Sequence, residues 1–501
     1  MSTTGPHELA AHLPADEIRR FHEVLARGGY NEEGLVGTLG PIQLPTLLRR
    51  DRAHFRHLTR RGRPLDLQIR LFLLGMPLTL EEARAALEPV GLEEWARAGL
   101  VGVQGGEVRG LVRIMAFRKL LLASDQLEAP GTIGRPDLVM GITASTSALA
   151  DSAVPRPSRS TLDLGTGSGV QAFLAAAWSE RVWAVDRSAR SINFARFNAA
   201  LNGVATPVEF LEGDGFEPVR GQTFDRILSN PPFAVSPSFR YLYRDSGMEG
   251  DAFARGIIEN AARCLNEGGY CQIVCDWAHV AGEDWKERLR AWFDGSGCDA
   301  WVMRTDTQEA AEYAHVWIRD TEHTGEEETD RQYGEWLAYY ARQRIEAIST
   351  GLIAIRKAGA KPNWVRIEDG PQSTSGEFGE HVALGFELGD FLQRVASDEA
   401  LLEVRLKVEP SARLDHVCEW EEASWRIRSA KIRLAGGLQY EANIDLRLAG
   451  MVALCDGLRT VREVLAHTAQ ALGADLDRIT PNCLALTRQL IERGFLLPVA
   501  G

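Results

Sequence analysis

The sequence predicts an α/β fold in which a mostly parallel sheet is flanked by helices, with a smaller module at each end. Three observations lead to this prediction. Short β-rich runs alternate with helical runs across residues 135–369, as in sheets whose parallel strands are joined by helices. The first strand of this block ends in a glycine-rich turn that opens a helix, which is a Rossmann-like arrangement. Both remaining segments, 1–130 and 370–501, combine helices with short strands.

The composition is that of a globular protein with a negative net charge. The chain has 501 residues, of which 45% are hydrophobic and 25% charged, and its formal net charge is −13. A chain of this length typically forms about three domains. The acidic balance disfavours tight, non-specific binding to nucleic-acid phosphates, although it does not exclude a local basic patch.

The sequence has no typical membrane span, secretion signal or metal site. No apolar run approaches the roughly 18–20 residues that a bilayer span requires, and the N-terminus lacks a basic segment followed by an apolar one. We therefore expect a cytoplasmic protein with no membrane partner. The seven cysteines are scattered without a CxxC pair, so we expect neither a disulfide framework nor a structural zinc site.

The first block, residues 1–130, begins with helical segments. Apolar residues recur at helical spacing in residues 45–62, 65–75 and 79–87, which predicts three helices. Thr79 stands where it can cap the third of these helices.

A hairpin is expected to follow these helices. Residues 100–123 are predicted to form two strands that turn at Gly105 and Gly106. Helices followed by a hairpin are typical of a winged helix. The helix at 45–62 also has an arginine face, which is more often a solvated surface but is able to contact RNA phosphates; it consists of Arg49, Arg52, Arg56, Arg60 and Arg63.

The second block, residues 135–369, is expected to form the central sheet. The candidate helices are 170–179, 188–203 and 251–269. The candidate strands are 160–165, 181–186, 207–213, 224–229 and 270–276, followed by the runs 301–306, 313–320, 351–357 and 364–369 as closing edge strands.

We expect the third block, residues 370–501, to end in a second module of winged-helix type. Residues 445–493 have a helical pattern, and the Gly-Phe-Leu-Leu run at 494–497 is expected to be a strand. The stretch 370–440 has a mixed pattern that predicts no particular element.

The glycine-rich turn is the first candidate for a binding site. A strand ends at Asp163 and Leu164, and a turn with Gly165, Thr166, Gly167, Ser168 and Gly169 leads into a helix. Glycines allow a tight turn and let a ligand approach the backbone, and free amides at a helix start favour an anion. Many nucleotide-binding folds use this device, and a plain strand-to-helix turn is the alternative.

Two acids follow the next two strands. Asp186 ends the second strand, where a carboxylate can accept both hydroxyl hydrogens of a ribose. Asp214 follows the third strand and can accept from an adenine amine, with Phe216 stacked nearby. The alternatives are that Asp186 caps the following helix, for which Ser188 is a rival, and that Asp214 is an ordinary turn residue.

The fourth strand ends in Asn230, Pro231, Pro232 and Phe233. Asn offers one carbonyl acceptor and two donors, and a Pro-Pro step is rigid and has no amide hydrogens. The side-chain carbonyl of Asn230 and an exposed backbone carbonyl of the Pro-Pro step are two acceptors beside an aromatic face. This arrangement suits a planar NH2 group on an sp² carbon. Adenine N6, guanine N2 and the side-chain amide of glutamine all meet this description, and Phe233 can stack on the target plane.

Together these motifs resemble class I methyltransferases of the "methyltransferase small domain" kind. This group includes release-factor glutamine methyltransferases and ribosomal RNA adenine-N6 and guanine-N2 methyltransferases. The resemblance covers about 100 residues from the first strand to the fourth, and more loosely the whole middle block, including the flanking runs at 141–151 and 243–251. It implies a seven-stranded sheet and S-adenosylmethionine (SAM) as the cofactor.

The resemblance also implies roles for the site residues. Asp163 and the turn from Gly165 to Gly169 would hold the methionine end of SAM, Asp186 the ribose and Asp214 the adenine. Asn230 would adjoin the cofactor and, with Pro231, Pro232 and Phe233, hold the substrate nitrogen. Glutamine-modifying enzymes of this group usually have Tyr where this chain has Phe233, which favours a nucleobase in ribosomal or transfer RNA. A glutamine in a translation factor and a non-catalytic, SAM-binding regulatory role are the alternatives.

The expected chemistry is in-line methyl transfer to the nitrogen. The site has to align the nitrogen lone pair with the methyl carbon, and such positioning can lower a barrier by about 7–11 kcal/mol. Acceptors at Asn230 and at the Pro231 carbonyl would localise the lone pair and stabilise positive charge as it develops. No general base is implied, because the methylated nitrogen loses its proton readily; His279, after the fifth strand, is expected to be structural.

Overall fold

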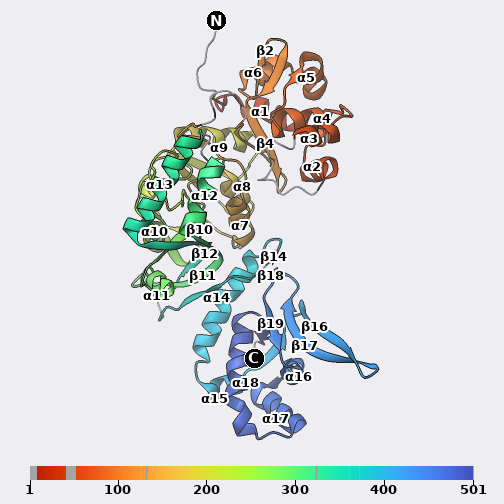
Figure 1. Cartoon of the computed structure of the whole chain (residues 1–501), viewed down its shortest axis with the longest axis vertical. Coiled ribbons are helices and arrows are strands. Elements are labelled where there is room, and N and C mark those ends of the chain that lie inside the picture. The colour runs from red at the N-terminus through yellow and green to blue at the C-terminus, as the bar shows by residue number, and fades with distance from the viewer. Residues whose placement is uncertain are drawn as a thin grey trace. The chain divides into compact units, whose positions relative to one another are not determined.

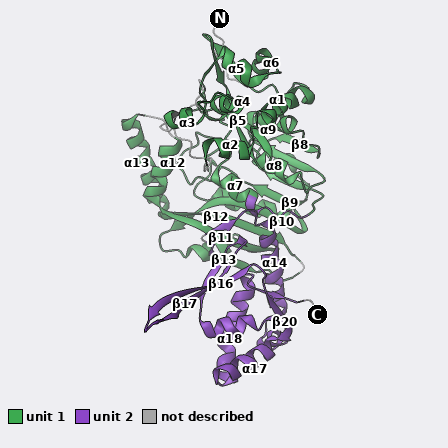
Figure 2. Ribbon diagram, turned by 90° about the vertical axis from the view of Figure 1, so that its right-hand side faces the viewer, with its two compact units in different colours: residues 1–150, 157–367 green, residues 151–156, 368–501 purple. Residues whose placement is uncertain are grey.

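The computed structural model describes residues 8–40, 52–127, 129, 132, 134–321, 325–359, 361–371 and 373–499. Figure 1 shows the elements in chain order. By its internal contacts the chain forms two compact units, which are coloured separately in Figure 2: unit 1 comprises 1–150 and 157–367, and unit 2 comprises 151–156 and 368–501. None of the described helices combines the length and the apolar character that a membrane crossing requires.

Unit 1 is built on an eight-stranded sheet with the order β13-β11-β12-β10-β9-β6-β7-β8. The strands β6 to β10 run parallel to one another, whereas β12 runs antiparallel to both β10 and β11. The prediction of seven strands is wrong by one, because β13 pairs with β11 as an additional edge strand. The strands are β6 (Thr161–Leu164), β7 (Val182–Asp186), β8 (Val208–Glu212), β9 (Phe224–Ser229), β10 (Leu265–Val280), β11 (Cys298–Glu309), β12 (Ile345–Lys357) and β13 (Val365–Asp369).

The helices that connect the parallel strands lie where the pattern predicts them. They are α8 (Val170–Ala175), α9 (Ala189–Asn202) and α10 (Ala252–Cys264), with a short η4 (Glu217–Val219) before β9. Ser188 caps α9 by accepting from the amide of Ser191, and Gly203 ends it with a φ of 59°. The predicted extension of α10 to residue 269 is wrong, because β10 begins at Leu265.

Two long helices stand where the sequence predicted an edge strand. The run 313–320 belongs to α12 (Ala310–Thr321), and α13 (Glu326–Gln343) follows it before β12. Tyr313, Ala314 and Ile318 are buried in α12, so its apolar residues follow the helical period rather than strand alternation. A third helix, α11 (Trp285–Arg290), connects β10 to β11.

The helices of the first block are shorter than predicted. The segment predicted as a helix at 45–62 is helical only in α3 (Arg52–Leu58), while Arg49 lies outside the described residues. Arg63 pairs with Asp66 at 2.9 Å. The other elements are α1 (Ala15–Arg27), α2 (Glu32–Leu39), α4 (Pro64–Gln68), the π-helix η3 (Ile69–Leu73), β1 (Leu78–Thr79), α5 (Leu80–Leu87), which Thr79 caps as predicted, and α6 (Leu92–Arg97).

The first block has two hairpins rather than one. Gly105 and Gly106, with φ of 61° and 83°, make the predicted turn between β2 (Val101–Gln104) and β3 (Glu107–Gly110). A second hairpin joins β4 (Val112–Phe117) to β5 (Leu120–Asp125). The strands β1, β3 and β2 form one small sheet in that order. The winged-helix character of this segment stays a prediction.

The first block shares a hydrophobic core with the central sheet. Phe21, Phe72 and Trp95 belong to the same buried cluster as Phe194 and Phe197 of α9. Burial of large apolar side chains is the main source of folding free energy, which explains why both segments fall in unit 1. The domain boundary near residue 130 stays a prediction.

Unit 2 combines helices with three small sheets. Its tail strand, Leu496–Pro498, overlaps the run predicted as a strand. The mixed stretch 370–440 includes two helices and, after them, a hairpin of two long strands. The elements are β14 (Thr374–Ser375), α14 (Gly379–Arg394), α15 (Asp398–Leu402), β15 (Arg405–Val408), β16 (Ala412–Glu421), β17 (Ser424–Leu434), β18 (Gly437–Leu438), β19 (Glu441–Ile444), α16 (Leu446–Ala453), β20 (Asp456–Thr460), α17 (Val461–Leu472), α18 (Leu476–Glu492) and β21 (Leu496–Pro498).

Candidate active site

The site lies at the switch point of the sheet, where the connections from β6 and β9 lead in opposite directions. Open α/β sheets bind ligands at such a point, outside the carboxyl ends of the strands. The glycine turn follows β6 and the Asn-Pro-Pro-Phe turn follows β9. The two turns are adjacent, since a Cβ added at Gly165 would lie 3.8 Å from the Cα of Pro231.

A cavity of about 1530 Å³ opens at this point. It exceeds the usual 300–1,000 Å³ of a small-molecule site, so it has room for a cofactor together with part of a substrate. All but two of the predicted site residues line it: Gly165, Thr166, Gly167, Ser168, Asp186, Asp214, Asn230, Pro231, Pro232 and Phe233.

Asp163 and Gly169 are the two that do not line the cavity. The carboxylate of Asp163 is buried behind the turn, where it accepts from the Thr166 hydroxyl at 2.6 Å and from the Ala172 amide at 3.0 Å. Burial raises the pKa of Asp163 to about 7. A Cβ at Gly169, whose φ is 93°, would lie 2.3 Å from the Phe173 ring. Both residues therefore shape the turn and do not face a ligand.

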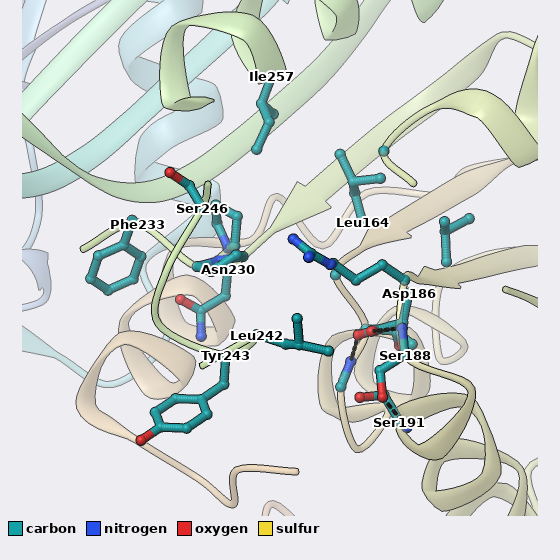
Figure 3. Close-up of a pocket in the computed structure, with 18 of the residues that line it drawn as sticks. Leu164, Asp186, Ser188, Ser191, Asn230, Phe233, Leu242, Tyr243, Ser246 and Ile257 are labelled. Atoms are coloured by element: carbon teal, nitrogen blue, oxygen red, sulfur yellow. Dashed lines mark hydrogen bonds between the residues drawn. The ribbon is translucent and has the colours of Figure 1, made fainter. Parts of the chain in front are cut away.

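Asp186 connects the ends of two strands (Figure 3). Its carboxylate accepts from the amides of Gly167 and Ser188, each at 2.9 Å. The alternative that Asp186 caps α9 is wrong, because Ser188 is the capping residue. Burial raises the pKa of Asp186. Each carboxylate oxygen retains a lone pair for a ligand hydroxyl.

Asp214 lies in the turn after β8, where its side chain lines the same cavity as Phe216. The neighbouring Gly213 and Gly215 have φ of 158° and 53°. Only glycine adopts the second value at little cost, so Gly215 allows the backbone to turn sharply beside Asp214.

Asn230 has an unpartnered carbonyl at the cavity. Its Oδ1 atom is buried and has no hydrogen-bond partner among the described residues, while its Nδ2 donates to the Thr146 hydroxyl at 3.4 Å. A buried acceptor without a partner costs about 1–3 kcal/mol. Such an atom at the wall of a cavity points to a donor supplied by a ligand. In Figure 3, Asn230 and Phe233 lie on one side of the cavity and Asp186 on the other.

Two polar residues near Asn230 were missed by the sequence analysis. Thr146, in α7 (Ala144–Ser152), orients the Asn230 amide, and Gln171, in α8, lines the cavity. Gln171 donates to the Thr146 carbonyl at 2.9 Å, and its Oε1 is buried without a partner among the described residues. The only sequence signal is a polar residue in the otherwise apolar start of α8.

Phe233 contacts a residue from the part of the chain that was wrongly predicted as a strand. The rings of Phe233 and Trp317 are 6.3 Å apart and meet edge to face at 75°. Trp317, Asp320 and Thr321 bring α12 into the wall of the cavity. His279 is absent from that wall and contacts the Ser349 hydroxyl at 2.7 Å.

The charged residues of the cavity wall are mostly acidic. Among the described residues, six acids and three arginines line it, and no lysine or histidine does. The wall thus favours a cation over an anion. The acids are Asp137, Asp186, Glu212, Asp214, Glu217 and Asp320, and the arginines are Arg187, Arg220 and Arg263.

Comparison with family models gives three matches along the chain. Residues 141–290 match the methyltransferase small domain. Residues 27–111 and 385–498 match two domains of unknown function, DUF7059 and DUF7782. The first match contains every residue that was predicted for the site.

The chain is also similar to curated proteins. The release factor glutamine methyltransferase of Agrobacterium fabrum is 31% identical over 199 residues, which are 36% of this chain and 67% of that protein. The release factor glutamine methyltransferase of Gloeobacter violaceus is 37% identical over 121 residues, which are 22% of this chain and 42% of that protein. The chain thus spans between 42% and 67% of the length of these two relatives.

Similarity to solved structures is weaker. The YcgJ protein from Bacillus subtilis is 15% identical with a TM-score of 0.29, covering 42% of this chain and 97% of that chain.

Proposed function

The chain belongs to the class I SAM-dependent methyltransferases, and from that premise we propose that it methylates the side-chain amide nitrogen of a glutamine in a protein. The observation that carries this proposal is the unpartnered Oδ1 of Asn230 at the wall of a cavity that also contains the glycine turn. The curated relatives described above are glutamine methyltransferases. They support the glutamine alternative better than the nucleobase that Phe233 favoured in the sequence.

The residues present fit SAM. A Cβ added at Gly167, which has a φ of 53°, would meet no atom within 4 Å, so the backbone of the turn is open to a ligand. The excess of acids in the wall suits a molecule with a sulfonium and an ammonium group. Asp186 would hold the ribose hydroxyls and Asp214 the adenine amine. When bound, SAM supplies a methyl group on a good leaving group.

The chain's own residues would position the acceptor nitrogen. The Oδ1 of Asn230 and the carbonyl of Pro231 would accept the two N–H hydrogens of the glutamine amide. These two hydrogen bonds localise the lone pair on the nitrogen, and they stabilise positive charge on the nitrogen as the new bond forms. Phe233 would pack on the planar amide and exclude water. The nitrogen then releases a proton to solvent, so no side chain has to act as a base.

The charge of the wall favours a protein substrate over RNA. Binding to RNA depends on lysine and arginine near the phosphates, and among the wall residues that the structure describes the acids outnumber the arginines by six to three. A glutamine side chain is neutral and brings no phosphate into this environment. Because the relatives are named for a release factor, a translation release factor is the first substrate to test.

The test is methyl transfer from radiolabelled SAM into an extract of cells that lack this enzyme. We expect label in protein that survives ribonuclease and disappears with protease, and we expect the labelled peptide to carry one methyl group on a glutamine. Asn230→Ala, which removes the acceptor, is expected to slow the labelling by about 10²-fold or more. Label that disappears with ribonuclease would overturn the proposal in favour of a nucleobase.

A further inference from the structure

We propose that the helices α12 and α13 fix the Asn-Pro-Pro-Phe turn in the conformation required for catalysis, with Tyr313 and Tyr340 as positioning residues. These helices lie beyond residue 290, where the match to the methyltransferase small domain ends. They contact the loop of residues 234–250, which follows Phe233 and leads to α10. The kinetic part of this inference rests on the proposed function, whereas its structural part does not.

Val235, two residues after Phe233, is hydrogen-bonded through both its backbone amide and its backbone carbonyl. Its amide donates to the Tyr313 hydroxyl at 3.1 Å, and its carbonyl accepts from the Tyr340 hydroxyl at 2.8 Å. Its side chain is fully buried in a cluster that includes both tyrosines and Trp336. Two helices thus fix the position and the direction of one residue next to the turn.

Asp276 of β10 sets the direction of the hydrogen bond at Tyr313. The Tyr313 hydroxyl donates to Asp276 Oδ2 at 2.5 Å, and the Thr350 hydroxyl donates to Oδ1 at 2.6 Å. Because its one proton is given to the carboxylate, the phenol oxygen acts as an acceptor for the Val235 amide. The sheet itself therefore fixes the contact between α12 and the loop.

The same two helices also hold the middle and the end of the 234–250 loop. Arg244 is buried, donates to the Thr321 hydroxyl at 2.5 Å and lies 5.5 Å from the centre of the Trp336 ring. The amide of Gly250 donates to the Tyr339 hydroxyl at 2.7 Å. The loop is thus anchored at three points along its length.

This anchoring matters because the loop and α12 form one wall of the cavity. Leu242, Tyr243 and Met248 of the loop line it together with Trp317 of α12. The rings of Trp317 and Phe233 pack edge to face. A shift of α12 would therefore move Trp317 and change the packing of the Phe233 ring in the cavity wall.

The test compares Tyr313→Phe and Tyr340→Phe with the matched control Tyr333→Phe. Tyr333 is in α13 too, but its hydroxyl donates to the Ala311 carbonyl within the same pair of helices. Each variant is first checked for retained SAM affinity, which shows that the fold is intact. Hydrogen–deuterium exchange of the peptide covering residues 230–236 then reports how often the backbone after the turn opens, and this measurement needs no substrate.

We expect this peptide to exchange up to about tenfold faster in Tyr313→Phe and Tyr340→Phe than in the control, because each loses one buried hydrogen bond. We also expect kcat to fall by roughly 10- to 100-fold, since misplacement by about 1 Å has such an effect, with KM and SAM affinity nearly unchanged. Exchange equal to that of Tyr333→Phe, or faster exchange with an unchanged kcat, overturns the inference. Failure of the proposed function is distinguishable, because the unsubstituted chain would then transfer no methyl group to protein. The exchange result would still decide whether the two tyrosines restrain the backbone next to the turn.

Discussion

The backbone amide of Gly167 donates to the carboxylate of Asp186 at 2.9 Å. This bond ties the glycine turn after β6 to the end of β7. The same carboxylate accepts from the backbone amide of Ser188, the residue that caps the start of α9. One side chain thus sets the shape of the turn and faces the cavity that the turn encloses.

Asp186→Ala is predicted to weaken SAM binding by about 100-fold or more. The variant loses acceptors for the ligand hydroxyls, and a hydrogen bond to a charged group contributes about 1.5–3 kcal/mol. Isothermal titration with SAM measures the effect. Asp225→Ala is the control, because Asp225 lies at the opposite end of β9, where it accepts from Asn266 and the Arg159 amide. Equal losses in both variants would contradict a ligand role for Asp186.

Asn230→Ala is predicted to lower kcat by about 10²-fold or more while SAM affinity stays nearly constant. The loss is comparable with that of removing one donor or acceptor that stabilises developing charge. Single-turnover methyl transfer and SAM titration separate the two effects. Asn193→Ala is the control, since the side chain of Asn193 donates to the Leu9 carbonyl and Asn193 does not belong to the described cavity wall. A parallel loss of SAM affinity in Asn230→Ala would refute the separation of roles.

Gly169→Ala is predicted to destabilise the protein more than Gly167→Ala. Both glycines have positive φ, so both variants gain strain of about 1–2 kcal/mol. Only at Gly169 does the new Cβ lie 2.3 Å from a ring, that of Phe173, and overpacking adds about 1–3 kcal/mol. Chemical denaturation measures both values, and similar losses would show that the ring moves aside freely.

The central part of the fold followed from the sequence because its signals are local. Each of β6, β7, β8 and β9 is a short run that ends at or just before a turn with glycine, an acid or Asn-Pro-Pro, and the carboxyl ends of parallel strands meet at one edge. That is why Asp186, Asp214 and Asn230 share a cavity. A strand period and a helix period are hard to tell apart in a run of eight residues, which is why α12 was taken for a strand.

The rest of the site depends on contacts that no local pattern reveals. Tyr313 and Val235 are 78 positions apart in the sequence, and Tyr340 and Val235 are 105 apart. Asp163 was assigned to the cofactor from its place next to the glycines, but its carboxylate points behind the turn, where the Thr166 hydroxyl and the Ala172 amide satisfy it. The direction in which a side chain points is decided by packing.

The buried carboxyl of Asp163 makes the stability of unit 1 depend on pH. Burial raises the pKa of Asp163 to about 7, whereas an aspartate in an unfolded chain has a pKa of about 3.9. Between these two values the folded state keeps a proton that the unfolded state has lost. The contribution of this group is therefore fully present below about pH 4, is lost as the pH rises to about 7, and is constant above that.

Asp163→Asn is predicted to remove this dependence, because the amide does not titrate and its oxygen can still accept from Thr166 and Ala172. The free energy of unfolding of the unsubstituted chain, minus that of the variant, should fall by about 1.4 kcal/mol per pH unit between about pH 4 and pH 7. Urea denaturation across this range measures the difference, in which other titrating groups cancel, including Asp276, whose pKa burial also raises to about 7. A difference that stays flat over this range would mean that Asp163 is ionised in the folded protein, so that its bonds to Thr166 and Ala172 outweigh the cost of burying the charge.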